Sequence, residues 1–230
     1  MLLARIAIED AQFRKEDVNG LVTDGAATPA AMAEYIGIQP TFATGVSMQG
    51  ASGATATTVA ASAIVAGICD TVLVVLGAGG GVGRTEGANT GYGLIYQRHM
   101  HEFGTKPEQM AKAAVDQRFN ALTNPNAAFQ GQPITIDDVL NSRYVNAPLH
   151  LLESVMPCDG AAACIVTTAE RARSTPNRPV YILGAGLKQG PAAIWQSPRI
   201  TAIPTRVSAA RAFQVAGYGP KDMQLAEFYD

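Results

Sequence analysis

Apolar and polar residues follow two periods along the first 80 positions, and the two periods alternate. Residues 2–7 carry apolar side chains at helical spacing, and the polar run 15–19 is typical of the turn after a helix. Short apolar runs at 20–23, 42–46 and 71–76 have the length and composition of buried strands. Strands that alternate with helices predict an α/β fold whose sheet is largely parallel and covered on both faces.

Local signals predict the helices between these strands. Thr28 precedes Pro29, and Gly37 follows the apolar run, which is the arrangement of a helix with an N-cap, a proline in its first turn and a glycine exit. The segment 51–66 is rich in alanine and has no charge, so it is expected to be a buried helix.

The pattern changes after residue 84. Residues 85–152 are more polar, and helices are expected to begin near Lys106 and at Thr135, where Thr135 can act as a cap. The earlier alternation then returns and predicts strands over 159–167, 180–183 and 223–229, and helices over 169–173 and 206–215.

Composition narrows the class of protein. Of 230 residues, 47% are hydrophobic and 16% charged, where about 25% charged is usual; we therefore expect subunit contacts, that is, a homo-oligomer. The net charge of −2 is spread along the chain and does not indicate a nucleic acid or a membrane surface as partner. Cys69, Cys158 and Cys164 have no paired spacing, which favours reduced thiols and a cytoplasmic protein.

The stretch most suited to chemistry lies where the strand 42–46 gives way to the helix 51–66. Gly50, Ala51, Ser52 and Gly53 are small enough for a ligand to approach the backbone. Unpaired N–H groups of Ala51, Ser52 and Gly53 are expected to point out of the helix start, together with the positive end of its dipole. Such a cradle suits an anion, or activates a thiol where a cysteine is present, but this stretch has no cysteine.

Several motifs in order resemble the thiolases, and most closely their sterol-carrier/lipid-transfer branch. The family's Cys-Ser-Thr-Gly or Cys-Ala-Ser-Gly corresponds to Gly50–Gly53, so Gly50 stands where the nucleophilic cysteine is expected. Residues 99–108, 124–129 and 138–142 are similar to the family's "HM..YGT…E…NP…DV..S", and 158–163 to its "SDGAAA", with Cys158 in place of serine.

The resemblance implies a thiolase-like layered α/β/α fold with a helical insertion. The implied division is a first part of the N-terminal domain core (1–84), the insertion (85–152), a second part of the core (153–175) and the start of a truncated C-terminal domain (176–230). A thiolase begins one strand earlier and continues further, so the C-terminal half is expected to be largely absent.

The last residues, 227–230, also differ from the common family pattern. The sterol-carrier thiolases have "VELHD", whereas Tyr229 resembles the "YD" of the retro-aldolase branch, which also lacks the cysteine. This resemblance implies retro-aldol cleavage of a 3-hydroxyacyl-CoA, with Tyr229 as the catalytic acid or base; the alternative is a core tyrosine at a strand end. Coenzyme A is then part of the substrate, no separate cofactor is expected, and a small OB-fold acyl-CoA protein is a possible partner.

Two other functions remain open. A thiolase or acetyl-CoA acyltransferase could use a different thiol, with Cys158 as the alternative nucleophile, or the chain could be an inactive acyl-CoA-binding subunit. Ser52 is not favoured as a nucleophile because no histidine lies near it in sequence. The alternative interpretation of Cys158 is a small buried hydrophobic residue that takes no part in the chemistry.

Three further sequence patterns are weaker indications of a binding site. His99, His101 and His150 lack metal-ligand spacing, so no metal is expected. The glycines between 77 and 83 do not fit the spacing G-x-G-x-x-G, and 85–96 lacks a helical pattern, which argues against a dinucleotide. The cations of the insertion, which the resemblance places over the phosphates of CoA, are Arg98, Lys106, Lys112 and Arg118.

Overall fold

The computed structural model describes residues 2–24, 28–78, 85–156, 160–191, 197–202 and 204–228. Contacts divide the chain into two compact units. The first unit holds 1–79, 159–188 and 205–230, and the second unit holds 80–158 and 189–204.

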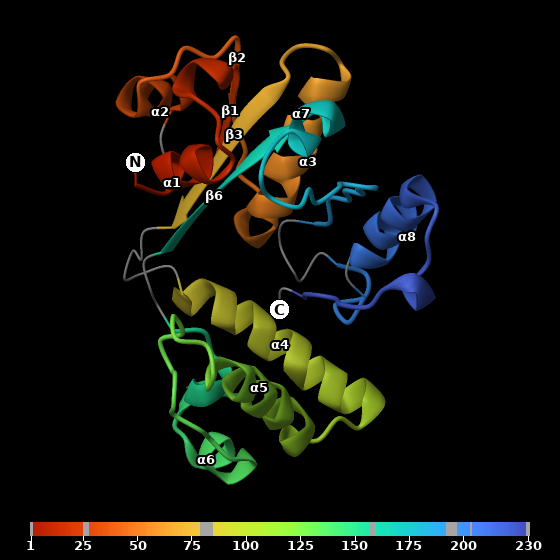
Figure 1. Ribbon diagram of the computed structural model, residues 1–230. Coiled ribbons are helices and arrows are strands. Elements are labelled where there is room, and N and C mark those ends of the chain that lie inside the picture. The colour runs from red at the N-terminus through yellow and green to blue at the C-terminus, as the bar shows by residue number, and fades with distance from the viewer. Residues whose placement is uncertain are drawn as a thin grey trace. The chain divides into compact units, whose positions relative to one another are not determined.

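A four-stranded sheet in the order β2-β1-β3-β6 forms the centre of the first unit (Figure 1). Strands β1 (Gly20–Thr23), β2 (Phe42–Gly45) and β3 (Thr71–Ala78) are parallel. Strand β6 (Gly160–Thr167) pairs antiparallel with β3 along eight residues of each strand and is outermost in the sheet. The predicted alternation of strands and helices is therefore confirmed, with one antiparallel strand at the edge.

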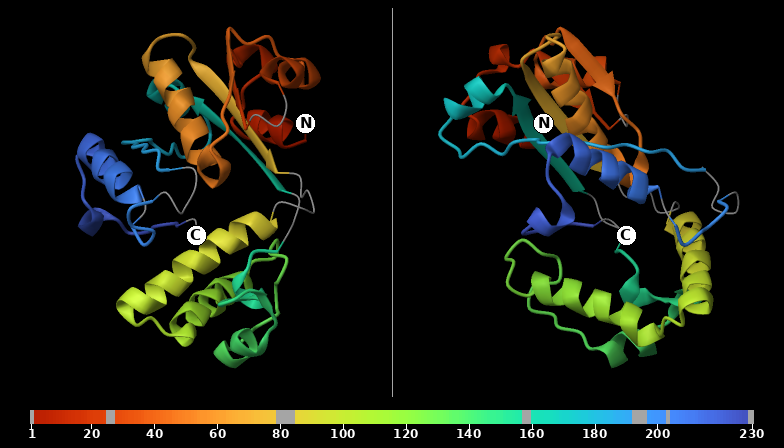
Figure 2. Two further views of the ribbon diagram at one scale, coloured as in Figure 1. Left: turned by 180° about the vertical axis from the view of Figure 1, so that it is seen from behind. Right: turned by 90° about the vertical axis from the view of Figure 1, so that its right-hand side faces the viewer.

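Helices cover both faces of this sheet, as Figures 1 and 2 show. On one face, α1 (Leu2–Asp10) and α2 (Pro29–Ile36) enclose a core that contains Leu21 and Leu73. On the other face, α3 (Ser52–Val65) packs through buried alanines. Alternate residues of β1 and β3 enter the two cores, which is why Leu21 and Val22 of β1 and residues 72–76 of β3 are apolar at consecutive positions.

The ends of α2 are set by local chemistry. The side chain of Thr28 accepts a hydrogen bond from the Ala31 N–H, and Pro29 is the first helical residue. Gly37 ends the helix at φ +78°, a left-handed conformation that favours glycine. All three predicted roles are confirmed.

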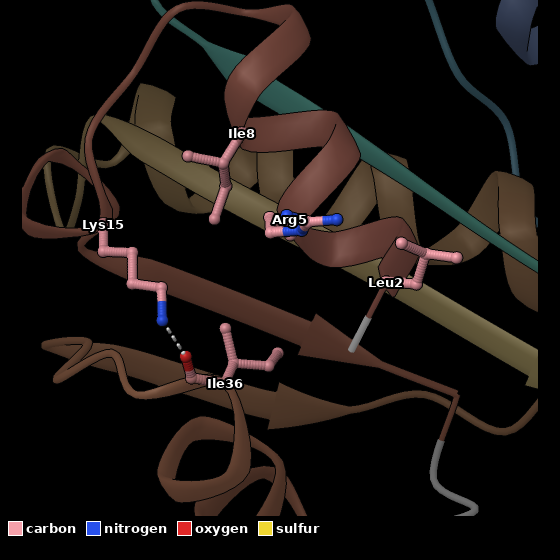
Figure 3. A pocket seen from close by; sticks show the side chains of 5 residues that line it. All are labelled: Leu2, Arg5, Ile8, Lys15 and Ile36. Atoms are coloured by element: carbon pink, nitrogen blue, oxygen red, sulfur yellow. Dashed lines mark hydrogen bonds between the residues drawn. The ribbon is translucent and has the colours of Figure 1, made fainter.

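A side chain from outside α2 also binds its carboxyl end. The Lys15 ammonium donates to the Ile36 carbonyl at 2.7 Å, where a cation is favoured by the helix dipole. Beside this bond lies a hollow of about 290 Å³ between α1 and α2 (Figure 3). Leu2, Arg5 and Ile8 line the α1 side of the hollow.

The second unit is helical, with one small hairpin. It contains α4 (Thr85–Phe103), α5 (Pro107–Ala121), α6 (Ile136–Asn141), and the strands β4 (Tyr144–Asn146) and β5 (Leu149–His150). Lys106 and Thr135 are the N-caps of α5 and α6, so both predicted helix starts are confirmed.

The prediction that residues 85–96 are not helical is wrong. These residues form more than half of the nineteen-residue α4. Its glycines weaken the sequence pattern, yet one of them lets the helix approach another backbone: a Cβ on Gly93 would lie 3.4 Å from the Asn146 carbonyl oxygen. Tyr96 is 4% exposed on the same helix, so tertiary packing outweighs local propensity here.

Helices α7 (Ala169–Arg173) and α8 (Thr205–Ala216) confirm two further predictions. The strand predicted over 180–183 does not form, nor does the described part, 223–228, of the last one. A strand needs a hydrogen-bonded neighbour, and Val180 is 95% exposed. Short 3-10 helices complete the described elements: η1 (Lys15–Asp17), η2 (Gln49–Ala51), η3 (Leu151–Glu153) and η5 (Pro220–Asp222).

Candidate functional site

The small-residue turn begins where β2 ends. The Val46 N–H donates to the Thr23 carbonyl at 2.8 Å, which ties the end of β2 to that of β1. Gln49 then adopts φ +51°, a left-handed conformation that is uncommon for a residue with a side chain. Strained backbone of this kind is concentrated at ligand and catalytic sites, which supports the choice of this turn.

Ser52 closes the turn from the first position of α3. Its side-chain oxygen accepts a hydrogen bond of 2.9 Å from the Met48 N–H. The hydroxyl is thus used at the helix start, which confirms the preference for this role over that of a nucleophile.

Two of the three amides expected to be unpaired have a backbone partner. The Ala51 N–H donates to the Met48 carbonyl at 3.1 Å, and the Ser52 N–H donates to the Gln49 carbonyl. The expectation is wrong for these two because η2 precedes α3, and a 3-10 turn pairs residues three apart. An oxyanion bound at this turn has to compete with the carbonyl oxygens of Met48 and Gln49 for these two N–H donors.

The cradle residues differ in exposure. Gly50 and Ala51 are exposed, whereas Ser52 and Gly53 are half-buried. A Cβ on Gly53 would lie 3.4 Å from Leu76 Cδ1, so the small residue lets the first turn of α3 pack closely on β3. The exposed part of the turn therefore includes Gly50, where the resemblance expects the cysteine.

One turn further along α3, Thr55 is a residue that the sequence analysis missed. It is 6% exposed, and its hydroxyl oxygen has no hydrogen-bond partner among the residues that the structure describes. Its neighbours Thr57 and Thr58 bond their hydroxyls to carbonyls one turn earlier. An unsatisfied buried hydroxyl costs about 1–3 kcal/mol, which marks Thr55 as a further candidate. In the sequence, the signal that could have identified Thr55 is a polar residue on the helix face that is otherwise formed by buried alanines.

Asp24 was also missed. Its carboxylate accepts a hydrogen bond of 2.6 Å from the Gly77 N–H, which joins the carboxyl end of β1 to that of β3. Ligands of open α/β sheets bind beyond the carboxyl ends of the strands. Asp24 therefore contributes an acidic group at the same end of the sheet as Gly50.

Other candidates cannot be placed. Cys158 and Tyr229 lie outside the described residues, as does most of the glycine-rich loop after β3. Cys69 is buried, and burial followed by the charge of Asp70 raises the pKa of its thiol. A raised pKa suits a structural cysteine and not a nucleophile.

His99 and His150 of the second unit have hydrogen-bond partners within the protein. His99 Nδ1 lies 2.7 Å from Thr105 Oγ1, and His150 Nδ1 lies 2.7 Å from the Ser142 carbonyl. Within the described ranges, no three His, Cys, Asp or Glu side chains form a group that could hold a metal ion.

Three of the four basic residues of the insertion already have partners. Arg98 pairs with Glu102, Lys112 pairs with Asp116, and the Arg118 guanidinium lies 3.9 Å over the Phe129 ring. The ion pairs partly neutralise the charges of Arg98 and Lys112, so these two are weaker candidates for a phosphate contact than their sequence positions indicate, whereas the ring beside Arg118 leaves its charge unchanged.

Comparisons with known proteins agree with the resemblance. The chain is 32% identical to the steroid side-chain-cleaving aldolase of Thermomonospora curvata over 97% of its own length and 66% of that protein. It is 39% identical to the acetyl-CoA acetyltransferase of Methanothermobacter thermautotrophicus over 60% of its own length and 36% of that protein. The solved structure of an "Ltp2-ChsH2(DUF35) aldolase" matches 94% of the chain and 63% of the solved chain, with a TM-score of 0.83 and 30% identity.

The matched proteins are longer than this chain. It spans between about a quarter and two thirds of the length of the curated relatives that it matches. No family model matches the chain. Within the part that the structure describes, no helix is long and apolar enough to cross a membrane.

Proposed function

Because the chain belongs to the thiolase superfamily, we propose that it provides the acyl-CoA site of an enzyme that cleaves a C–C bond by retro-aldol chemistry. The observation that carries this proposal is Gly50. An exposed turn at the start of α3 is kept, but position 50, where the family's cysteine is expected, has no side chain that could form an acyl-enzyme. Loss of the nucleophile with retention of the turn suits a reaction without a covalent intermediate.

The substrate is a 3-hydroxyacyl-CoA. A base removes the proton of the 3-hydroxyl group, the C2–C3 bond breaks, and its electron pair forms the thioester enolate. Protonation of C2 then gives a shorter acyl-CoA and a ketone or an aldehyde. The Gly50–Gly53 turn stabilises the enolate oxygen, and Tyr229 moves the proton, a role that rests on its sequence position alone.

The likeness to the aldolase of Thermomonospora curvata supports this choice, since it extends over nearly the whole chain. The name of the solved aldolase joins two components, which supports a second subunit for this chain as well. We assign that subunit the role of an OB-fold acyl-CoA partner, and CoA enters only as part of the substrate.

The test uses a version of the protein that covers the full length of its relatives, with and without such a partner. Incubation with a 3-hydroxyacyl-CoA should release the shorter acyl-CoA and the carbonyl product, which mass spectrometry detects. Tyr229→Phe should lower kcat at least about a hundredfold, because a general acid or base contributes about 10² to 10⁴ to the rate. An unchanged kcat in Tyr229→Phe removes that residue from the mechanism.

Acyl transfer is the second candidate, and the 39% identity to an acetyl-CoA acetyltransferase favours it. In that reaction a thiolate attacks the thioester carbonyl and CoA leaves, so the protein carries the acyl group. Cys158 is the alternative nucleophile. Mass spectrometry after incubation with acetyl-CoA separates the two reactions, because only acyl transfer leaves an acetylated cysteine. CoA binding without either reaction points to an inactive acyl-CoA-binding subunit.

A further inference from the structure

Gln49 is one of two described residues other than glycine that have a positive φ, and Gln12 is the other. Gln12, at φ +53°, provides the left-handed exit from α1, since the Phe13 N–H donates back to the Ile8 carbonyl at 3.1 Å. Gln49, at φ +51°, begins η2 and ends no helix. The conformation costs free energy for any residue with a Cβ, and a glycine at this position would avoid that cost.

The described part of the chain gives no structural reason for a side chain at position 49. Packing does not explain it, because Gln49 is exposed. Internal hydrogen bonding does not explain it either, because the carboxamide is bonded to no described residue. Unfavourable backbone conformations persist mainly at functional sites, where the rest of the fold compensates for them. A glutamine in this place therefore indicates that its carboxamide acts on a ligand.

The turn also has few backbone donors left for an enolate oxygen. The N–H groups of Ala51 and Ser52 donate to the carbonyls of Met48 and Gln49. The Gly50 N–H has no acceptor among the described residues, so it is available. Enzymes that stabilise an oxyanion combine such a backbone donor with a further donor, for which the side-chain amide of asparagine or glutamine is suitable.

We propose that the side-chain amide of Gln49 donates a hydrogen bond to the enolate oxygen of the substrate, beside the Gly50 N–H. Gln49 is then a catalytic residue of the retro-aldol reaction, and this inference rests on the function proposed above. The carboxamide is neutral, so it stabilises the negative oxygen at any pH at which the protein is folded. The 2.9 Å bond between Ser52 and Met48 holds the backbone on both sides of Gln49.

The probe is acetoacetyl-CoA, which loses a C2 proton to solvent and forms an enolate with its own ultraviolet absorbance, without cleavage of a C–C bond. It is mixed with an excess of the version of the protein that covers the full length of its relatives, with and without the partner. The parent protein should raise the enolate fraction at a fixed pH. Gln49→Ala should lower the enolisation constant of the bound probe at least about tenfold, and kcat with a 3-hydroxyacyl-CoA about a hundredfold.

Three further variants separate a donor from a structural role. Gln49→Gly removes the unfavourable φ and should raise the melting temperature by about 2–4 °C, yet lose the enolate as Gln49→Ala does. Gln12→Gly is the matched control, which should also raise the melting temperature but leave the enolate fraction unchanged. Ser47→Ala removes another exposed polar side chain of the turn and should change neither the enolate fraction nor kcat.

The two readouts judge the inference and the proposed function separately. The role of Gln49 is wrong if the parent protein does not raise the enolate fraction, if Gln49→Ala raises it equally, or if Ser47→Ala lowers it as much as Gln49→Ala. Turnover that persists at the parent rate in Gln49→Ala removes Gln49 and leaves the retro-aldol reaction in place. An enolate that depends on Gln49, without release of a shorter acyl-CoA from a 3-hydroxyacyl-CoA, supports the donor and overturns the retro-aldol reaction.

Discussion

The hydroxyl oxygen of Ser52 accepts a 2.9 Å hydrogen bond from the backbone N–H of Met48, and this bond spans the turn that contains Gly50. Between the two residues, Gln49 holds a left-handed conformation. The bond satisfies an amide that the turn leaves without a helical partner. The position of Gly50 relative to α3 thus depends on a side chain two residues away.

Removal of this hydroxyl should loosen the turn. Ser52→Ala leaves the Met48 N–H without its partner, and we expect the free energy of unfolding to fall by about 1 kcal/mol. Urea denaturation followed by circular dichroism measures the change. Ser62→Ala is the matched control on the same helix, because its exposed hydroxyl bonds the Thr58 carbonyl and water can replace it. A loss in Ser62→Ala as large as that in Ser52→Ala would contradict the proposed role of the turn.

A thiol placed at position 50 should be activated. Gly50→Cys introduces an exposed cysteine just before α3, where the helix dipole lowers a thiol pKa. We expect alkylation by iodoacetamide at pH 7 to be at least about tenfold faster than in Ser62→Cys, near the opposite end of the same helix. The rates are measured by mass spectrometry, which separates the new cysteine from the native ones. Equal rates at the two positions would show that the turn does not favour an anion.

Local chemistry explains which predictions succeeded. The ends of α2 depend on Thr28, Pro29 and Gly37, and each acts within four residues of its own position. The charge-free run 51–66 likewise predicts a helix that packs on the sheet, but only one face of α3 is buried, and Val65 is 88% exposed. Such features require no knowledge of the rest of the fold.

Other features depend on distant residues and could not be predicted. Helix α4 contains Gly91 and Gly93 and is supported by contacts with the β4–β5 hairpin, more than 50 residues away. The apolar segment 180–183 has the composition of a strand but no described partner strand. At the candidate site, the amides of Ala51 and Ser52 are paired because a 3-10 turn replaces a regular helix start. The hydrophobic periodicity of the sequence does not distinguish a 3-10 turn from a regular helix start.

The two glycines of α4 should respond differently to alanine. A Cβ on Gly91 would meet no atom within 4 Å, so Gly91→Ala should stabilise the protein by about 0.5–1 kcal/mol through the higher helix propensity of alanine. On Gly93 the Cβ would lie 3.4 Å from the Asn146 carbonyl oxygen and 3.6 Å from that of Ala147. We therefore expect Gly93→Ala to stabilise the protein less than Gly91→Ala does, or to destabilise it. Thermal unfolding of both variants checks the difference, and equal gains would mean that α4 does not approach the hairpin closely.

The buried phenol of Tyr96 should make stability depend on pH in the alkaline range. Burial is the main cause that raises its pKa to about 12, with the charge of Glu153 next. In the unfolded chain a tyrosine ionises near pH 10, so between about pH 10 and 12 the folded chain binds one more proton. This contribution to stability is complete below pH 10 and is lost as the pH rises towards 12. A spectroscopic titration at 295 nm should show a late tyrosinate step, which Tyr96→Phe removes and Tyr35→Phe, at an exposed site, leaves intact. If Tyr96→Phe leaves the late step unchanged, the buried environment of α4 described above is wrong.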